Sequence, residues 1–274
     1  MSEAVRGGRV SVNGVDMYYE VHGAGDPLVL LHGALSGIGT SFGVLLPALA
    51  RRRRVIAVEL QGHGRTPDTD RPLDAEAMAC DVAGLLREVV GGPADVLGYS
   101  MGGSVAMELA AAEPGLVRSL VLVSVGFSPE GLYPEVLGGI GEMAAEDMAG
   151  SPFYEEYMRT APDPQGWAGL FAKVQAMDAD IRTWSPEELR AIAAPVLLAV
   201  GDSDIVRPEH AAQLFRFFGG GVPGDLTGLP AARLAVLPGT THITAVHRDD
   251  LLVPMVEEFL TDTAAKAGPA LEAG

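Results

Sequence analysis

The pentapeptide Gly98-Tyr99-Ser100-Met101-Gly102 follows the short apolar run Val96-Leu97 and precedes a stretch in which apolar residues recur at helical spacing. A Gly-x-Ser-x-Gly sequence at a strand-to-helix junction is typical of a nucleophile elbow, a turn so tight that its serine takes a strained backbone conformation. The flanking glycines are required because larger side chains would collide with neighbouring backbone. We therefore expect the Ser100 hydroxyl to project clear of a sheet, with the next peptide N–H beside it.

The apolar pattern on both sides of this turn predicts an α/β fold. Alternating apolar residues around Asn13-Gly14 predict a β-hairpin. Buried strands are expected over residues 28–31, 55–60, 95–98, 120–125, 196–200 and 234–237, and helices over residues 42–49, 74–90, 101–112, 209–218 and 249–260. Continuous apolar strands separated by amphipathic helices favour a mostly parallel sheet with helices on both faces.

The stretch over residues 128–190 interrupts this alternation. Prolines recur there, aromatic residues cluster, and no buried strand is expected. We interpret it as a helical insertion between two strands of one core domain, whose two parts are residues 1–127 and 191–263. A second, smaller loop insertion is expected at residues 219–228. Residues 264–274 are small and polar, and we expect them to form a flexible tail.

Composition excludes several classes of partner. The chain has 274 residues, of which 48% are hydrophobic, so it can bury a large core. Its formal net charge of −17 repels phosphate backbones and anionic lipid, which argues against nucleic-acid or membrane-surface binding. The run Arg51-Arg52-Arg53-Arg54 is expected to be the solvated end of a helix. No apolar segment has the length of a signal peptide or a spanning helix, so we expect a soluble, cytoplasmic protein.

Metal and disulfide chemistry are not expected. Cys80 is the single cysteine, which excludes an intrachain disulfide and thiolate metal clusters, and we expect it to be a buried, inert thiol. Neither a His-Glu-x-x-His motif nor a complete dinucleotide- or phosphate-binding glycine motif occurs. The sequence therefore implies no metal and no cofactor.

A serine hydroxyl needs a base to take its proton, and the base needs a partner that holds its tautomer. In this type of elbow the acid and then the histidine follow the serine along the chain. His242 ends the segment Pro238-Gly239-Thr240-Thr241-His242, expected to be a loop after the last strand. His210 lies within a predicted helix and His247 opens the final one, so His242 is the favoured base.

Two aspartates compete for the role of the acid. Both follow the predicted strand over residues 196–200, in the segment Gly201-Asp202-Ser203-Asp204. Asp202 lies nearer the strand, where an aspartate commonly caps a turn. Asp204 reaches further round the loop, and the spacing alone leaves both candidates open.

Five ordered motifs resemble those of the α/β-hydrolase superfamily, and the resemblance covers nearly the whole chain. They are His32-Gly33-Ala34, Gln61-Gly62-His63-Gly64-Arg65, Gly98-Tyr99-Ser100-Met101-Gly102-Gly103, Gly201-Asp202-Ser203-Asp204 with Pro208, and Gly239-Thr240-Thr241-His242. The resemblance implies the α/β-hydrolase fold, with residues 128–190 as a helical lid over the active site.

Residue roles follow from the same resemblance. Ser100 is implied to be the nucleophile, Asp204 the acid and His242 the base, with the backbone N–H groups of Ala34 and Met101 forming an oxyanion hole. The histidines His32 and His63 are implied to be structural loop residues. Glu59 departs from the family's usual aspartate, and we expect this to affect loop packing only. Residues expected to contact substrate are Leu35, Phe127, Tyr154, Trp167, Trp184 and Ile205.

These features predict a cofactor-independent serine hydrolase that cleaves a carboxylic ester, lactone or thioester through an acyl-enzyme intermediate. Carbon–carbon bond hydrolysis and perhydrolysis on the same residues are the enzymatic alternatives. A non-catalytic ligand-binding member of the fold is the alternative outside catalysis. The expected substrate is a small apolar ester, and the expected assembly is a monomer or homodimer.

Overall fold

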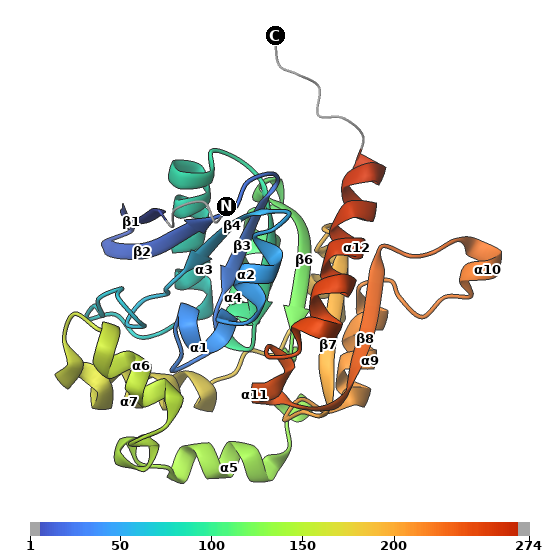
Figure 1. Cartoon of the computed structure of the whole chain (residues 1–274). Coiled ribbons are helices and arrows are strands. Elements are labelled where there is room, and N and C mark those ends of the chain that lie inside the picture. The colour runs from blue at the N-terminus through green and yellow to red at the C-terminus, as the bar shows by residue number, and fades with distance from the viewer. Residues whose placement is uncertain (1–5, 268–274) are drawn as a thin grey trace.

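Eight strands form one sheet in the structure, a computed structural model that describes residues 6–267 (Figure 1). The strands are β1 (Arg6–Val12), β2 (Val15–His22), β3 (Pro27–Leu31), β4 (Arg54–Val58), β5 (Ala94–Tyr99), β6 (Val117–Val123), β7 (Val196–Ser203) and β8 (Ala232–Thr241). Their order across the sheet is β1-β2-β4-β3-β5-β6-β7-β8. β1 and β2 are antiparallel to their neighbours and every later pair is parallel, so the predicted mostly parallel sheet is confirmed.

The expected hairpin is present at Asn13-Gly14. β1 pairs with β2 so that Val12 faces Val15, and the two turn residues have φ angles of 48° and 83°. Two consecutive positive φ values match the right-handed twist of the strands, and asparagine followed by glycine tolerates them best.

Helices cover both faces of the sheet (Figure 1). On one face lie α1 (Ile38–Phe42), α2 (Leu45–Leu49) and α12 (Asp249–Ala267); on the other lie α3 (Ala75–Leu85), α4 (Met101–Ala112) and α9 (Pro208–Phe217). Along β3 the side chains alternate between these layers, with Leu28 and Leu30 in the first core and Val29 and Leu31 in the second. Because both faces are buried, the strand is apolar throughout, as the sequence predicts.

Several helices differ in extent from the expected ranges. The helix expected over residues 42–49 is two short helices, because Pro47 has no N–H to donate to a carbonyl one turn earlier. Asp74 caps α3 by accepting the Ala77 N–H at 2.7 Å, and a π-helical turn, Leu86–Val90, completes the expected length. α12 continues past residue 260 to Ala267, and residues 268–274 of the expected tail lie outside the described residues.

Two side chains are not where the sequence predicts them. Cys80 is exposed, so its prediction as a buried thiol is wrong: it lies two residues, or about 200° of helical rotation, from the buried Met78. Arg53 is buried rather than solvated, since its guanidinium contacts Glu257 on α12 at 3.1 Å. Cationic helix ends are usually solvated, but here the facing carboxylate on α12 compensates the buried charge.

Residues 128–190, which we call the helical insertion, lie across the carboxyl ends of the strands (Figure 1). They contain α5 (Pro134–Glu142), α6 (Pro152–Thr160), α7 (Trp167–Ala179) and nearly all of α8 (Pro186–Ala191), with short 3-10 turns at Pro129–Gly131, Ala145–Met148 and Pro164–Gly166. Three of these helices begin with proline, whose missing N–H costs nothing in the first turn. The recurring prolines therefore mark helix starts, and the chain re-enters the sheet at β7.

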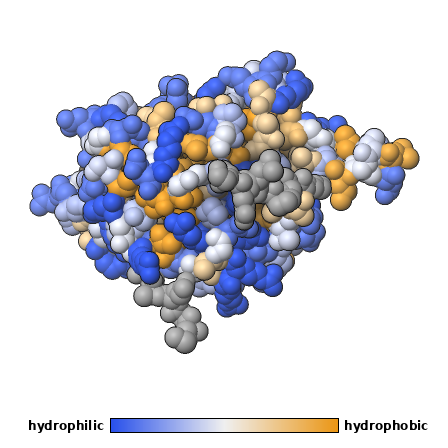
Figure 2. Space-filling view, turned by 90° about the horizontal axis from the view of Figure 1, so that it is seen from above, coloured by the Kyte–Doolittle hydropathy of each residue, from blue (hydrophilic) through white to orange (hydrophobic). Residues whose placement is uncertain are grey.

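A narrow arm formed by residues 219–231 projects from the body between α9 and β8 (Figure 1). It carries the short helix α10 (Gly224–Thr227) and corresponds to the expected loop insertion. Hydrophobic residues are visible on it in the space-filling view (Figure 2), and Leu226 and Leu229 are 84% and 76% exposed. Among the described helices, none combines the length and apolar character needed to cross a bilayer.

Candidate active site

The tight turn after β5 presents Ser100 at the carboxyl edge of the sheet. Ser100 has φ 52° and ψ −120°, a positive φ that a residue with a side chain rarely adopts. A Cβ atom on Gly98 would lie 2.3 Å from the carbonyl oxygen of Gly102, and one on Gly102 would lie 2.1 Å from that of Leu31. The geometry expected of the Gly-x-Ser-x-Gly turn is therefore present.

Ser100, His242 and Asp204 form one chain of hydrogen bonds, although they come from three different strand ends. Ser100 Oγ lies 3.0 Å from His242 Nε2, and His242 Nδ1 lies 2.8 Å from Asp204 Oδ1. His242 is the first residue of α11 (His242–Ala245) rather than part of a loop, because β8 continues to Thr241. With Nδ1–H donated to the carboxylate, the Nε2 lone pair is left to accept the serine proton.

The Asp204 carboxylate is buried and fully hydrogen-bonded. It accepts the Ser124 hydroxyl at 2.5 Å, the Val206 N–H at 3.1 Å and the Gly201 N–H at 3.2 Å, besides His242. Burial acts to raise the pKa of this carboxyl, but the bonds from His242, Ser124 and Val206 outweigh it and lower the pKa below the ordinary value. Asp204 is therefore ionised at neutral pH.

Asp202, the other candidate, has a different task. Its carboxylate accepts the Gly239 N–H at 2.9 Å and the Thr240 N–H at 3.3 Å, on the strand that leads to His242. This is the turn-capping role that sequence reasoning offers for it. His247 lies apart from the chain of hydrogen bonds, with Nε2 3.3 Å from the carbonyl oxygen of Thr40.

The loop after β3 carries Ala34 and Leu35 past Ser100. Leu35 has φ 57°, and its N–H donates to His63 Nε2 at 3.1 Å, while His63 Nδ1 donates to the Gln61 carbonyl at 2.8 Å. Burial lowers the pKa of His63 to about 3, so its Nε2 stays free to accept this bond. A neutral histidine thus fixes the backbone beside Ala34.

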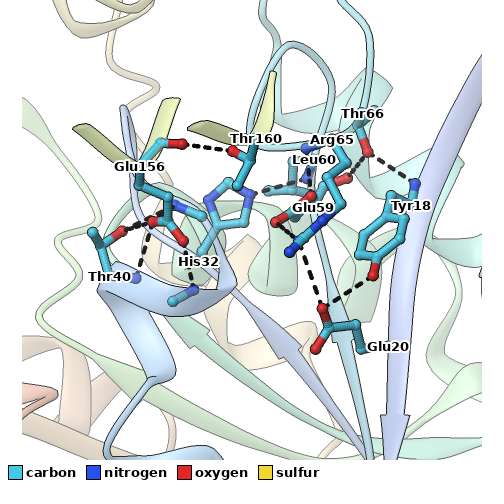
Figure 3. A network of polar contacts seen from close by, with 12 residues as sticks. Tyr18, Glu20, His32, Thr40, Glu59, Leu60, Arg65, Thr66, Glu156 and Thr160 are labelled. Carbon is cyan, nitrogen blue, oxygen red and sulfur yellow. Dashed lines mark hydrogen bonds and ion pairs between the residues drawn. The ribbon is translucent and has the colours of Figure 1, made fainter. Parts of the chain in front are cut away.

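His32, whose ring centroid lies 5.0 Å from that of His63, also holds loop backbone (Figure 3). Its Nε2 accepts the Leu60 N–H at 3.0 Å and its Nδ1 donates to the Gly33 carbonyl at 2.7 Å. Burial lowers the pKa of His32 to about 4. Both histidines therefore hold loops, in keeping with the structural role that the sequence motifs imply.

A carboxylate from the helical insertion is fastened to this same region (Figure 3). Glu156 on α6 accepts the N–H groups of Gly37, Gly39 and Thr40 at 3.0, 2.8 and 3.0 Å, and the Thr40 hydroxyl as well. These N–H groups stand at the start of α1, where the helix dipole favours a negative charge. The bonds tie the insertion to the loop that follows Ala34 and Leu35.

Glu59, the departure from the family motif, is buried at the end of β4 (Figure 3). Its carboxylate accepts one hydrogen bond from the backbone N–H of Arg65 and another from Nη1 of the Arg65 guanidinium, at 2.9 Å. Burial raises the pKa of Glu59 to about 7. The side chain packs the loop that carries His63, as expected.

A cavity of about 420 Å³ opens over Ser100 and His242. Ala34 and Met101 line it, and so do three of the six residues expected to contact substrate: Leu35, Trp184 and Ile205. The helical insertion, including Phe153, Phe171 and Val174, and the core, including Tyr99 and Val125, supply comparable shares of its remaining wall.

The other three expected contact residues, Phe127, Tyr154 and Trp167, are not among the described residues that line this cavity. Phe127 stacks on the ring of His210 with centroids 3.9 Å apart, and Tyr154 meets Trp167 edge-on at 5.5 Å. Their ring faces are taken up by other side chains of the protein, because aromatic rings gain from packing against one another. The expectation that they contact substrate is corrected accordingly.

Sequence reasoning missed Asp178, near the end of α7, which also lines the cavity. A signal was available: Phe171, Val174 and Asp178 are spaced i, i+3, i+7, so the aspartate continues an apolar helical stripe. Within residues 6–267, no group of three or more histidine, cysteine, aspartate or glutamate side chains is arranged to hold a metal ion.

The sequence of this chain is similar to those of known hydrolases and related enzymes. Residues 28–254 match the model of the alpha/beta hydrolase family. A pimeloyl-acyl-carrier protein methyl ester esterase from Neisseria meningitidis is 30% identical over 240 residues, which cover 80% of this chain and 88% of the relative. A non-heme haloperoxidase from Rhodococcus erythropolis is 30% identical over 259 residues, covering 84% and 90%.

Solved structures share the same architecture. A meta-cleavage product hydrolase from Pseudomonas fluorescens superposes with a TM-score of 0.75 over 93% of this chain and 98% of its own. The two sequences are 20% identical, so this likeness concerns the fold.

Proposed function

We propose that this chain, which belongs to the alpha/beta hydrolase family, is a cofactor-independent serine hydrolase that cleaves a small carboxylic ester, lactone or thioester. The observation that carries the proposal is the unbroken chain of hydrogen bonds from Ser100 through His242 to Asp204, opening onto the cavity. The names of the two relatives indicate two kinds of reaction to consider for this fold: one relative is named as a methyl ester esterase and the other as a haloperoxidase.

In the proposed acylation step, Ser100 Oγ attacks the substrate carbonyl carbon while its proton passes to His242 Nε2. Asp204 holds the imidazole in the required tautomer and stabilises the imidazolium that forms. The tetrahedral intermediate then collapses, the bond to the leaving group breaks, and the departing oxygen or sulfur takes the proton from Nε2. An acyl group remains on Ser100.

Deacylation repeats these proton transfers with water. His242 takes a proton from the water that attacks the acyl carbon and returns it to Ser100 Oγ, releasing the carboxylic acid. In both steps the backbone N–H groups of Ala34 and Met101 are proposed to stabilise the oxyanion. Each such donor lowers the barrier by about 3 kcal/mol when it is aimed at the developing charge.

The helical insertion is proposed to act as the lid that shapes the substrate pocket. The apolar wall over Ser100, with Leu35, Trp184 and Ile205, favours a compact apolar acyl group. Burying such a group contributes about 25 cal/mol per Å² of apolar surface removed from water.

The proposal is tested with a fluorophosphonate probe and a panel of p-nitrophenyl esters from acetate to palmitate. One covalent adduct is expected, located by peptide mass spectrometry to Ser100, together with turnover of short and medium esters. Folded Ser100→Ala protein is the matched control and should take up no label. Labelling at another residue, or no turnover of any ester by labelled wild-type protein, contradicts the proposal.

Perhydrolysis is the second candidate, because one relative that is 30% identical is named as a non-heme haloperoxidase. In that reaction hydrogen peroxide replaces water as the attacker of the acyl-enzyme and yields a peracid. Formation of peracetic acid from acetate and peroxide, measured beside ester hydrolysis, separates the two activities.

A further inference from the structure

Asp178 stands out among the cavity residues because its carboxylate has no partner. It lies on the apolar stripe of α7, one turn beyond Val174, which is 3% exposed. Within residues 6–267, no hydrogen bond or ion pair joins its carboxylate to another group. It lines the same cavity as Ser100 and His242.

This position is costly for a carboxylate. Burial raises the pKa of Asp178 to about 6, which means that the surroundings disfavour the charged form. Asp178 also lies in the last turn of α7, where the carbonyl end of the helix dipole repels negative charge. An apolar residue here would continue the stripe, so packing does not account for an aspartate.

The charged residues that line the cavity are also predominantly acidic. The described residues that line it include five acidic ones, Asp74, Glu76, Glu108, Asp178 and Asp180, and one arginine, Arg182. Arg182 is already held by Glu108 at 2.6 Å and by Glu188 at 2.7 Å. The cavity therefore carries an excess of negative charge that attracts a cation.

The part of the substrate that meets Asp178 follows from the rest of the cavity lining. The apolar side chains of Leu35, Trp184 and Ile205 are proposed to receive the acyl group. The leaving group is then the part of the substrate left to meet a carboxylate.

We infer that Asp178 is a specificity-determining residue that binds a protonated amine in the leaving group, so that the preferred substrates are esters of amino alcohols. The inference rests on the proposed function, because it takes the reaction and its direction from there. The ammonium N–H donates to the carboxylate, and the apolar wall receives the acyl group. A charge-assisted hydrogen bond of this kind is about twice as strong as a neutral one.

Two isosteric esters test the inference: 2-(dimethylamino)ethyl butyrate, which is cationic at pH 7.5, and 3-methylbutyl butyrate, its neutral counterpart. We expect wild-type kcat/KM to favour the cationic ester by about tenfold or more, as one charge-assisted bond predicts. Asp178→Asn keeps the shape and removes the charge, and should abolish most of that preference. Glu155→Gln removes one charge from an exposed site of the insertion outside the cavity, and should leave the preference within about twofold.

A binding experiment keeps this test separate from that of the proposed function. Calorimetry on Ser100→Ala protein compares 2-(dimethylamino)ethanol with 3-methylbutanol, and no turnover is needed. Tighter binding of the amino alcohol, lost in Ser100→Ala/Asp178→Asn, supports the inference even when neither ester is cleaved, in which case the proposed function fails. Equal binding of the two alcohols, or a preference for the cation that survives Asp178→Asn, overturns it. A purely structural role would change the melting temperature and leave the preference intact.

Discussion

The sheet core and the helical insertion contribute to the cavity in different ways. In the core, Asp204 is held by four hydrogen-bond donors and Ser100 by a backbone turn that admits only glycine two positions on either side. The insertion contributes Phe171 and Val174, held by packing alone, and Asp178, which has no partner among the described residues. In the proposed reaction the core therefore supplies the reacting groups, and the insertion supplies part of the wall that receives the substrate.

The largest effect tests the core side of this comparison. Ser100→Ala should lower kcat on p-nitrophenyl butyrate by a factor on the order of 10⁵ to 10⁶, because loss of a nucleophile removes the covalent route. Circular dichroism should show an unchanged fold. A residual rate within about a hundredfold of wild type would mean that another residue carries the reaction.

The next effect divides the two aspartates that follow β7. Asp204→Asn should lower kcat by about 10⁴, because an amide favours the wrong tautomer of His242. Asp202→Asn should leave kcat within about tenfold and lower the melting temperature, since it weakens the hydrogen bonds that the Gly239 and Thr240 N–H groups donate to this side chain. Equal losses of activity at both positions, with normal stability, would leave the acid unassigned.

A smaller effect is the dependence of the free energy of unfolding on pH. It arises from buried histidines of the core, since residues 128–190 contain no histidine. Burial lowers the pKa values of His32, His63 and His210 to about 4, 3 and 4, below the ordinary 6.5. At a pH between the folded and the ordinary pKa, these histidines bind more protons in the unfolded chain than in the folded one. The stability they contribute is therefore fully present above pH 6.5 and is lost as pH falls toward 4. Each histidine contributes a slope of up to about 1.4 kcal/mol per pH unit.

Urea denaturation at pH 7, 6 and 5 measures this slope in wild type and His63→Gln. The variant should show a slope smaller by one proton, while the carboxyl groups that titrate in this range affect both proteins alike. Identical slopes would mean that His63 is not a buried, neutral acceptor.

The smallest effect concerns the join between the two regions. Glu156→Gln should lower the free energy of unfolding by about 2 kcal/mol, because three peptide N–H groups lose a charged acceptor. The neighbouring Glu155 is exposed, so Glu155→Gln is the matched control and should change stability by less than about 0.5 kcal/mol. An unchanged Glu156→Gln protein would show that the insertion is held in place by apolar packing alone.

The sequence predicts the core far better than the insertion, for physical reasons. Ser100, Asp204 and His242 stand at strand ends, where the order of parallel strands brings distant segments together, so motifs in chain order suffice. The cavity wall depends on how short helices pack, and local patterns do not encode which face of each aromatic ring is covered. Trp184 lines the cavity whereas Trp167 is packed against Tyr154 and Phe171, although both are tryptophans of the insertion.

Other differences were in principle readable from the spacing. Cys80 is two residues from the buried Met78 and therefore lies on the opposite face of α3, and Asp178 continues the stripe of Phe171 and Val174. Glu156 is different, because its partners at residues 37–40 are more than a hundred positions away and, apart from the Thr40 hydroxyl, are peptide N–H groups without a side-chain signature.

The positive φ of Ser100 has a consequence for how this protein can evolve. A residue with a Cβ atom in such a backbone region costs on the order of 1 to 3 kcal/mol, whereas glycine adopts it freely. A glycine at position 100 would therefore relax the turn while removing the proposed nucleophile. Selection for stability alone would favour glycine at position 100, whereas selection for catalytic turnover favours serine. A serine that is preserved there in a lineage therefore indicates that its chemistry is still under selection.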